Sequence, residues 1–262
     1  MDDRSEWEQT ALRMLGQDHQ SVWRRYCDAL NRRWLEPWLP TARAARALKT
    51  DLFDEAMGRG LYGLLRPRSA CLIGQDLAVE MVGAARARYP DFAVVGSDVR
   101  RLPFAGGCLD LVVSNSTLDH FSSLAELVEA LAEIFRVLRP GGWLLLTLDN
   151  LGNPAVALRN WLPASWLLAM RMIPYRMGAT LSPRTGPRVL REVGFDVVES
   201  ATFMHCPRLP AVLVSRLVEA LAGRRSQDRF LEALQRFEQC SRWPTRFLTG
   251  YFLAYRACKP AA

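Results

Sequence analysis

The residues best suited to chemistry follow three apolar runs in the middle of the chain. Ser97-Asp98 follows the first run, Asn115 to His120 follow the second, and Asp149-Asn150 follow the third. A histidine exchanges a proton near neutral pH, so His120 is a candidate general base. The neighbouring oxygen-bearing side chains suit hydroxyl groups, amino groups or a hard cation. These segments predict one polar site, provided that the fold brings them together.

The three runs have the length and order of strands in a parallel sheet. Val94-Val95, Leu111–Val113 and Trp143–Leu148 are short and apolar, and the segments between them leave room for crossover helices. The carboxyl ends of such strands meet at one edge of an open sheet, where ligands bind. The pattern predicts an α/β protein with a doubly wound sheet and helices on both faces.

Composition indicates a globular chain. Half of the 262 residues are hydrophobic and 23% are charged, and the net charge is +7. The arginines are scattered, which favours a generally basic surface over a dedicated nucleic-acid site. The six cysteines have no metal-ligand spacing, and no apolar run reaches the ~18 residues of a membrane span. We therefore expect a cytoplasmic protein with reduced thiols and no transmembrane span.

Residues 1–45 are expected to form an N-terminal helical cap or extension, ahead of a main domain at 46–262. Five apolar residues at spacings of three and four predict one helical face: Trp23, Tyr26, Leu30, Trp34 and Trp38. This face either packs on the main domain or caps the ligand crevice.

The first strand-to-helix turn is acidic. Nucleotide-binding α/β proteins usually place glycines here, but this chain has Asp51, Phe53, Asp54 and Glu55. Such a turn would repel a pyrophosphate and suits a ligand with positive charge. Asp76, at the end of the second strand, is placed to accept hydrogen bonds from ribose hydroxyls.

Residues 46–205 resemble the class I S-adenosylmethionine-dependent methyltransferases. RLPFAGGCLDLVVSNSTLDHF is similar to the family's stretch entering strand four, and RVLRPGGWLLLTL to its helix, turn and strand five. The family's glycine-rich motif is replaced by LKTDLFDEA, so Asp51 or Glu55 is expected to bind the cofactor's ammonium and Lys49 its carboxylate. The resemblance implies a Rossmann-like sheet of seven strands with the last one reversed. It also implies cofactor contacts by Lys49, Thr50, Asp51, Phe53, Glu55, Asp76, Leu77, Asp98, Val99, Asn115 and Ser116.

Methyl transfer needs an aligned acceptor and, where the acceptor carries a proton, a base. His120 is the preferred base, with Asp119, His205 and Asp149 as further candidates. A magnesium site built from Asn115, Asp119 and Asp149-Asn150 is an alternative that we do not favour, because Asn115 stands where related O-methyltransferases carry a charged ligand. No metal ligand is therefore assigned.

Two insertions are expected in the second half of the chain. An apolar lid is predicted at about 152–182, where Trp161, Trp166 and Met170 supply an adaptable surface, with core packing or peripheral membrane contact as alternatives. A helical insertion is predicted at about 207–242.

The function expected from the sequence is methyl transfer from S-adenosyl-L-methionine to a small, fairly apolar and lipophilic metabolite, leaving S-adenosyl-L-homocysteine. One alternative is an RNA or protein methyltransferase, although no specific nucleic-acid module is present. The other is a non-catalytic binding or scaffold protein. The acceptor atom and the oligomeric state are left open.

Overall fold

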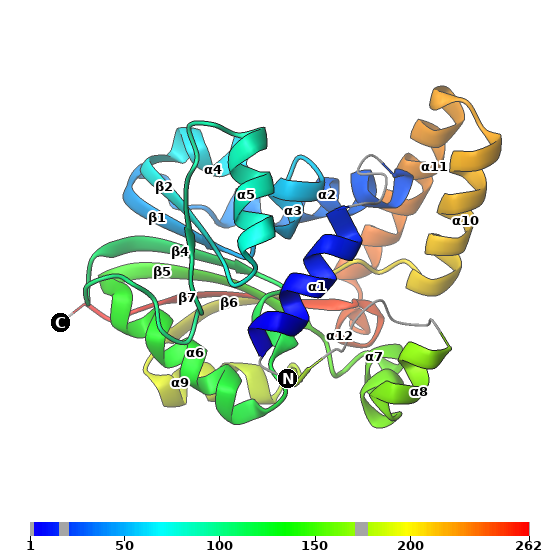
Figure 1. The fold of residues 1–262 in the computed structure, drawn as a ribbon. Helices are drawn as coiled ribbons and strands as arrows, with labels where there is room; N and C mark the ends of the chain where they lie inside the picture. The colour runs from blue at the N-terminus through cyan, green and yellow to red at the C-terminus, as the bar shows by residue number, and fades with distance from the viewer. Residues whose placement is uncertain (1–2, 16–20, 171–177, 262) are drawn as a thin grey trace.

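The computed structural model describes residues 3–15, 21–170 and 178–261, and its centre is a seven-stranded sheet in the order β3-β2-β1-β4-β5-β7-β6 (Figure 1). Neighbouring strands are parallel, except that β7 is antiparallel to β5 and β6. The strands are β1 (Ala44–Thr50), β2 (Ser69–Asp76), β3 (Ala93–Gly96), β4 (Leu109–Asn115), β5 (Leu138–Asp149), β6 (Asp196–Phe203) and β7 (Phe252–Cys258). The predicted Rossmann-like sheet with a reversed last strand is confirmed.

Helices cover both faces of the sheet (Figure 1). The α-helices of the described residues are α1 (Asp3–Leu15), α2 (Val22–Leu35), α3 (Phe53–Met57), α4 (Tyr62–Leu65), α5 (Val79–Arg88), α6 (Leu124–Val137), α7 (Pro154–Trp161), α8 (Ala164–Ala169), α9 (Thr185–Val193), α10 (Arg208–Leu221), α11 (Arg224–Arg236) and α12 (Arg246–Thr249).

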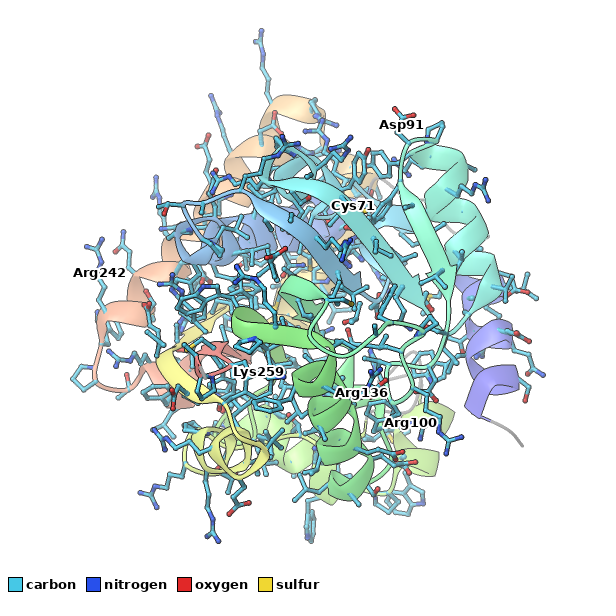
Figure 2. The ribbon with its side chains drawn as sticks, turned by 90° about the vertical axis from the view of Figure 1, so that its left-hand side faces the viewer. Cys71, Asp91, Arg100, Arg136, Arg242 and Lys259 are labelled. Atoms are coloured by element: carbon cyan, nitrogen blue, oxygen red, sulfur yellow. The ribbon has the colours of Figure 1, made fainter. Side chains whose placement is uncertain are left out.

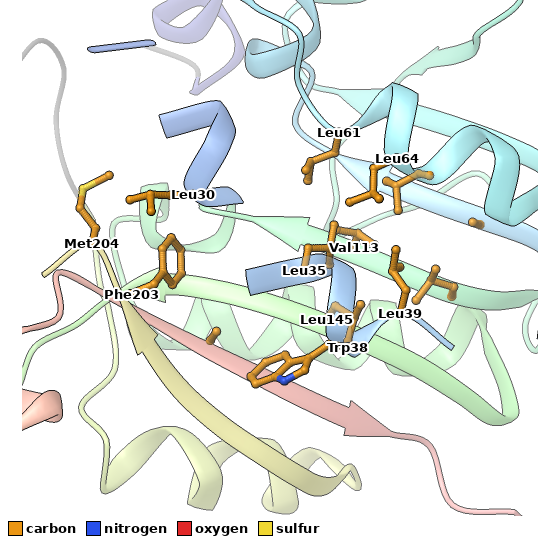
Figure 3. Close-up of a cluster of buried hydrophobic side chains, with 14 of the residues drawn as sticks. Leu30, Leu35, Trp38, Leu39, Leu61, Leu64, Val113, Leu145, Phe203 and Met204 are labelled. Carbon is orange, nitrogen blue, oxygen red and sulfur yellow. The ribbon is translucent and has the colours of Figure 1, made fainter. Parts of the chain in front are cut away.

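The core has two layers because side chains alternate across the sheet. On β5, Leu145 packs with residues of α2 and α4, whereas the adjacent Leu144 packs with residues of α6 and α9. Figure 3 shows the first layer, in which Leu30 and Leu35 of α2 lie over the sheet. Helices thus pack on both faces of the same strands. The strand ends that form the site are therefore supported from both faces of the sheet.

Helix α6 shows how local sequence specifies an element. Ser123 and Glu126 form a reciprocal capping box at its start. One face is buried because apolar residues recur every three or four positions: Leu127, Ala130, Leu131, Ile134 and Val137. The cap residue Ser123 lies three residues after His120, so the cap positions the end of the preceding loop.

The N-terminal residues form two helices with different neighbours. Tyr26 and Leu30 bury the predicted aromatic face of α2 in the core, so this face mainly packs on the sheet. Helix α1 instead packs through Ala11 against Met57 and Met81, close to the carboxyl end of the sheet.

Among the described residues, no helix is both long enough and apolar enough to cross a membrane.

Candidate functional site

Two cavities lie at the carboxyl edge of the sheet. The smaller one, of about 130 Å³, is lined by residues that follow β2, β3 and β4. The larger one, of about 460 Å³, extends between α1, α2 and α10. Trp7, Asp51, Asp76 and His120 line both cavities. The two spaces therefore form one site with a narrow and a wide compartment.

Asp51 directly follows β1 and has an unusual backbone conformation. Its φ of 66° lies in the left-handed region that non-glycine residues avoid. The Lys49 ammonium donates to the backbone oxygen of Asp51, and the Asp51 carboxylate accepts from the Phe53 backbone N–H at 2.8 Å. These contacts hold the carboxylate at the junction of the two cavities, the place that glycine usually occupies in this turn.

Lys49 and Glu55 bind each other rather than the cavities. Their charged atoms are 2.8 Å apart, and both side chains are almost fully buried. Glu55 also accepts from the Leu61 backbone N–H at 2.7 Å, and a side chain at Gly60 would collide with it. Neither residue lines a cavity, in contrast to the expectation that Lys49 binds the cofactor's carboxylate and that Glu55, as the alternative to Asp51, binds its ammonium. Their pairing instead supports the turn that carries Asp51.

Asp51 and Asp76 place two carboxylates at the cavity junction. Asp76 accepts from the backbone N–H groups of Leu52 and Ala78, each at 2.8 Å, and this connects the first two strand ends. Burial and the nearby charge of Asp76 raise the pKa of Asp51 well above its ordinary value. A ligand with positive charge would relieve this repulsion.

The smaller cavity has the groups expected around an adenosine. Leu77, Asp98 and Val99 line it together with Asp76. Arg100 binds Asp98 through its Nη2 at 2.6 Å, and although burial opposes the effect, this arginine lowers the pKa of Asp98. Asp98 is therefore a fixed, ionised acceptor beside the apolar side chain of Val99.

Asn115 and Ser116, at the end of β4, line the larger cavity. The Asn115 amide donates to Asp54 at 3.1 Å and accepts from the Thr147 hydroxyl at 3.0 Å, so its orientation is fixed. Thr50, by contrast, is buried against the hydroxyls of Ser114 and Thr117 and lines neither cavity. Phe53 lines the larger cavity, with the Arg24 guanidinium 5.1 Å from its ring centre.

Backbone strain gathers at this site. Within the described part of the chain, three non-glycine residues have positive φ: Asp51, Ser116 and Met204. All three line the larger cavity, although they follow three different strands. Strain of this kind persists where function requires a particular geometry, so its concentration here supports assigning the site to these strand ends.

His120 is the candidate base that reaches the cavities. It lies in a short turn after β4, and the Trp7 ring is 4.8 Å away in an edge-on arrangement. Burial lowers the pKa of His120 to about 4. The imidazole is therefore neutral at physiological pH and able to accept a proton. Ser123, not His120, caps the following helix.

The other three catalytic candidates lie outside both cavities. Asp119 accepts from the Asp149 backbone N–H at 2.9 Å, and Asp149 forms a 2.7 Å ion pair with Arg159. His205 is buried, and its Nδ1 lies 2.8 Å from the Thr249 hydroxyl. His205 therefore does not reach the cavities as expected, because its ring nitrogens lie against Thr202 and Thr249. These residues stabilise loops.

The donor set for magnesium does not converge. Asn150 donates to the backbone oxygens of Phe247 and Gly250, and Asp149 is neutralised by Arg159. Across residues 3–15, 21–170 and 178–261, no cluster of three or more histidine, cysteine or acidic residues could hold an ion. The residues present do not fit the metal alternative, and no chemical step is derived through it.

Sequence reasoning missed much of the wall of the larger cavity. Trp7 of α1, Arg24 of α2, and Arg208 and Arg216 of α10 all line it. Amphipathic helical patterns signal these helices but not the strand ends that they approach.

The apolar segment at about 152–182, expected to form a lid, does not line either cavity with any of its described residues. Residues 171–177 lie outside the described residues.

Comparison of the sequence with known proteins finds similarity to methyltransferases. Residues 56–146 match the family model described as a methyltransferase domain. The chain is 34% identical over 133 residues to a demethylmenaquinone methyltransferase of Beutenbergia cavernae, covering 50% of this chain and 48% of that protein. It is 33% identical over 132 residues to a malonyl-[acyl-carrier protein] O-methyltransferase of Enterobacter lignolyticus, covering 50% and 47%. The chain thus spans about half the length of these curated relatives.

Solved structures show the same fold across nearly the whole chain. A putative methyltransferase in complex with the Trm112 activator of Haloferax volcanii has a TM-score of 0.64 at 19% identity, covering 100% of this chain and 99% of that one. The N-methyltransferase NodS of Bradyrhizobium japonicum, in complex with S-adenosyl-L-homocysteine, has a TM-score of 0.60 at 15% identity, covering 97% and 99%. At these identities the likeness establishes the fold alone.

Proposed function

We propose that this chain, which carries a class I S-adenosylmethionine-dependent methyltransferase domain, transfers the cofactor's methyl group to a small, fairly apolar acceptor. The observation that carries the proposal is the pair of carboxylates, Asp51 and Asp76, at the junction of two cavities. S-adenosyl-L-methionine is a cation at its sulfur and at its amino group, and it supplies an activated methyl group when bound. A cationic ligand beside Asp51 would counteract the burial and the charge of Asp76 that raise the pKa of this carboxyl, and so would favour its ionised form.

Different parts of the cofactor are proposed to bind in the two cavities. Asp76 is proposed to bind the ribose, with Asp98 and Val99 around the adenine, since these residues line the smaller cavity. Asp51 is proposed to bind the amino group, because its side chain faces both cavities. Lys49 and Glu55 act indirectly, by holding the turn in the conformation that presents Asp51.

His120 is proposed to remove a proton from the acceptor. It is the one of the four catalytic candidates that lines the cavities, and its low pKa keeps the ring unprotonated at neutral pH. Trp7 packs against the ring and helps to orient it. An acceptor hydroxyl or ring carbon near His120 would lie between the strand ends and α1.

The larger cavity favours an apolar acceptor. Its wall includes several large apolar side chains from different elements: Met14, Trp23, Phe53, Met57, Met81, Met204, Val212 and Phe252. Methionine and aromatic side chains adapt to flat or irregular ligands. The similarity to a demethylmenaquinone methyltransferase supports a lipophilic acceptor of this kind.

Calorimetry with S-adenosyl-L-homocysteine tests the proposal. The wild-type chain is expected to bind, and Asp51→Asn is expected to weaken binding by roughly tenfold to a hundredfold because an ionic contact is lost. Asp91→Asn, at an exposed carboxylate that lines neither cavity, is the matched control and should bind as wild type. Absence of binding by folded wild-type protein would refute the proposed function.

A further inference from the structure

Helix α10 exposes a row of leucines to solvent. Leu209, Leu213, Leu217 and Leu221 recur every fourth residue, and their exposed fractions are 58%, 60%, 60% and 84%. Such spacing places them along one side of the helix. Ala211 and Ser215, on another side, are buried against the rest of the protein. The leucine row, as we call these four residues, is an apolar surface of the kind that marks an interaction site.

The segment that carries the leucine row is strongly basic. Residues 208–246 contain eight arginines and four acidic residues, and so contribute more than half of the net charge of +7. Arg224, Arg225 and Arg229 are exposed on α11, which pairs with α10, and Arg242 extends from the surface in Figure 2. Arginines beside an apolar helix face are complementary to an anionic lipid surface, where leucines insert and guanidinium groups bind headgroups.

Exposed tryptophans occur on two other helices. Trp161 of α7 and Trp166 of α8 have exposed fractions of 80% and 67%. In Figure 1, α7 and α8 lie on the same right-hand side of the molecule as α10 and α11, away from the C-terminus. Tryptophan is favoured at the membrane–water interface because its ring is apolar and its N–H is polar. Both pairs of helices therefore present side chains suited to the same kind of partner.

The leucine row also borders the site. Val212, Arg216 and Glu219 of the same helix line the larger cavity, and they lie on the side next to the leucines. If the leucine row of α10 contacted a lipid surface, the wall of the larger cavity that α10 forms would lie next to that surface.

We propose that the leucine row and the surrounding arginines dock this protein on an anionic membrane surface. Docking is a property of the surface of α10 and α11 and needs no cofactor. Resting on the proposed function, we add that the lipophilic acceptor enters the larger cavity from the lipid.

Flotation with lipid vesicles tests the docking. The full chain is mixed with vesicles of phosphatidylcholine, or of equal parts of phosphatidylcholine and phosphatidylglycerol, without acceptor. Wild-type protein is expected to float with the anionic vesicles, and added salt should release much of it. Leu213→Glu/Leu217→Glu, which places two charges in the leucine row, should reduce the bound fraction by about tenfold. Arg224→Gln/Arg225→Gln should reduce binding to the anionic vesicles and its salt dependence.

A matched variant controls for surface charge. Leu124→Glu/Val198→Glu adds the same two carboxylates at exposed apolar positions on α6 and β6, and should float as wild type. Circular dichroism and calorimetry with S-adenosyl-L-homocysteine on each variant separate loss of docking from loss of folding or of the cofactor site. Failure of folded wild-type protein to float with anionic vesicles would overturn the inference, whatever its cofactor affinity. Equal flotation of wild type and Leu213→Glu/Leu217→Glu would also overturn it, as would a wild-type dimer that this variant dissociates while no vesicle binds.

Discussion

The neutral state of His120 follows from where its ring is buried. The ring lies beside Trp7 at the cavity junction, and burial disfavours its charged form. Asp119, the preceding residue in the chain, is turned away from both cavities and held by the Asp149 backbone. Adjacent residues thus receive opposite assignments, one as the proposed base and one as a loop anchor.

Replacing His120 tests the proposed base. NMR titration of the wild type should show one histidine ring that protonates near pH 4, and this signal should be absent from His120→Asn. Above that pH the ring is neutral, so methyl transfer to a panel of phenols and hydroquinones should not fall between pH 8 and about 5. His120→Asn should lower the transfer rate by roughly a hundredfold to ten-thousandfold, with cofactor affinity changed less than tenfold. An unchanged rate would exclude His120 as the base.

Asp119 makes a separate prediction about stability. Burial and the charge of Asp149 raise the pKa of Asp119 to about 7 in the folded state, against about 3.9 in the unfolded chain. Its contribution to stability is therefore full below pH 4 and is lost as the pH rises to 7. Urea unfolding should show wild type losing stability relative to Asp119→Asn over this interval. Parallel pH curves for the two proteins would contradict the assignment.

At the scale of elements, the turn between β1 and α3 lacks the glycines that nucleotide-binding α/β proteins usually have there. Lys49 and Glu55 form a buried ion pair, and Lys49 also donates to the backbone oxygen of Asp51. The pair restrains this glycine-free turn. Two acidic residues of this turn therefore differ in their surroundings: Glu55 is paired with Lys49 inside the protein, and Asp51 lines both cavities.

Breaking the pair from one side should be costly. Lys49→Met leaves Glu55 charged and buried, and should lower the free energy of unfolding by about 3 to 5 kcal/mol in urea denaturation. The double variant Lys49→Met/Glu55→Met should recover part of that loss, since no charge is left unpaired. Arg188→Met, which removes an exposed pair with Glu192, is the control and should leave the urea midpoint almost unchanged. A loss for Lys49→Met as small as the control's would argue against this role of the pair.

At the scale of the molecule, the site joins distant parts of the chain. Asp51, Asp76 and His120 follow β1, β2 and β4, and Trp7 reaches the same junction from α1. A ligand that binds there would contact residues at the ends of three strands and a residue of α1 at the same time. Binding should therefore be visible in the stability of the whole protein.

Thermal unfolding measures this coupling. S-adenosyl-L-homocysteine at a hundred times its dissociation constant should add about 2.7 kcal/mol to the free energy of unfolding. For a chain of this size, that corresponds to a rise in Tm of roughly 5 to 10 °C. Asp51→Asn at the same ligand concentration should show a much smaller rise. An unchanged Tm for wild type at saturating ligand would count against the site.

The sequence by itself determined the sheet and the order of its strand ends. Apolar runs that stop on polar residues are local signals, and because parallel strands end at one edge, they bring Asp51, Asp76, Asp98 and His120 to the same region. All four line the cavities. Whether each of them binds the cofactor or the acceptor stays a prediction.

Only the tertiary structure decided which neighbouring polar residues are sequestered. Lys49 and Glu55 are six residues apart and pair because β1 and α3 fold onto each other, and His205 turns into the protein at the end of β6. The approach of Trp7 and of α10 to the strand ends depends on packing between segments far apart in the sequence. Hydrophobic periodicity predicts that a helix has an apolar side but carries no information about its partner. For the same reason, the exposed leucine row of α10 emerged only once the fold was known.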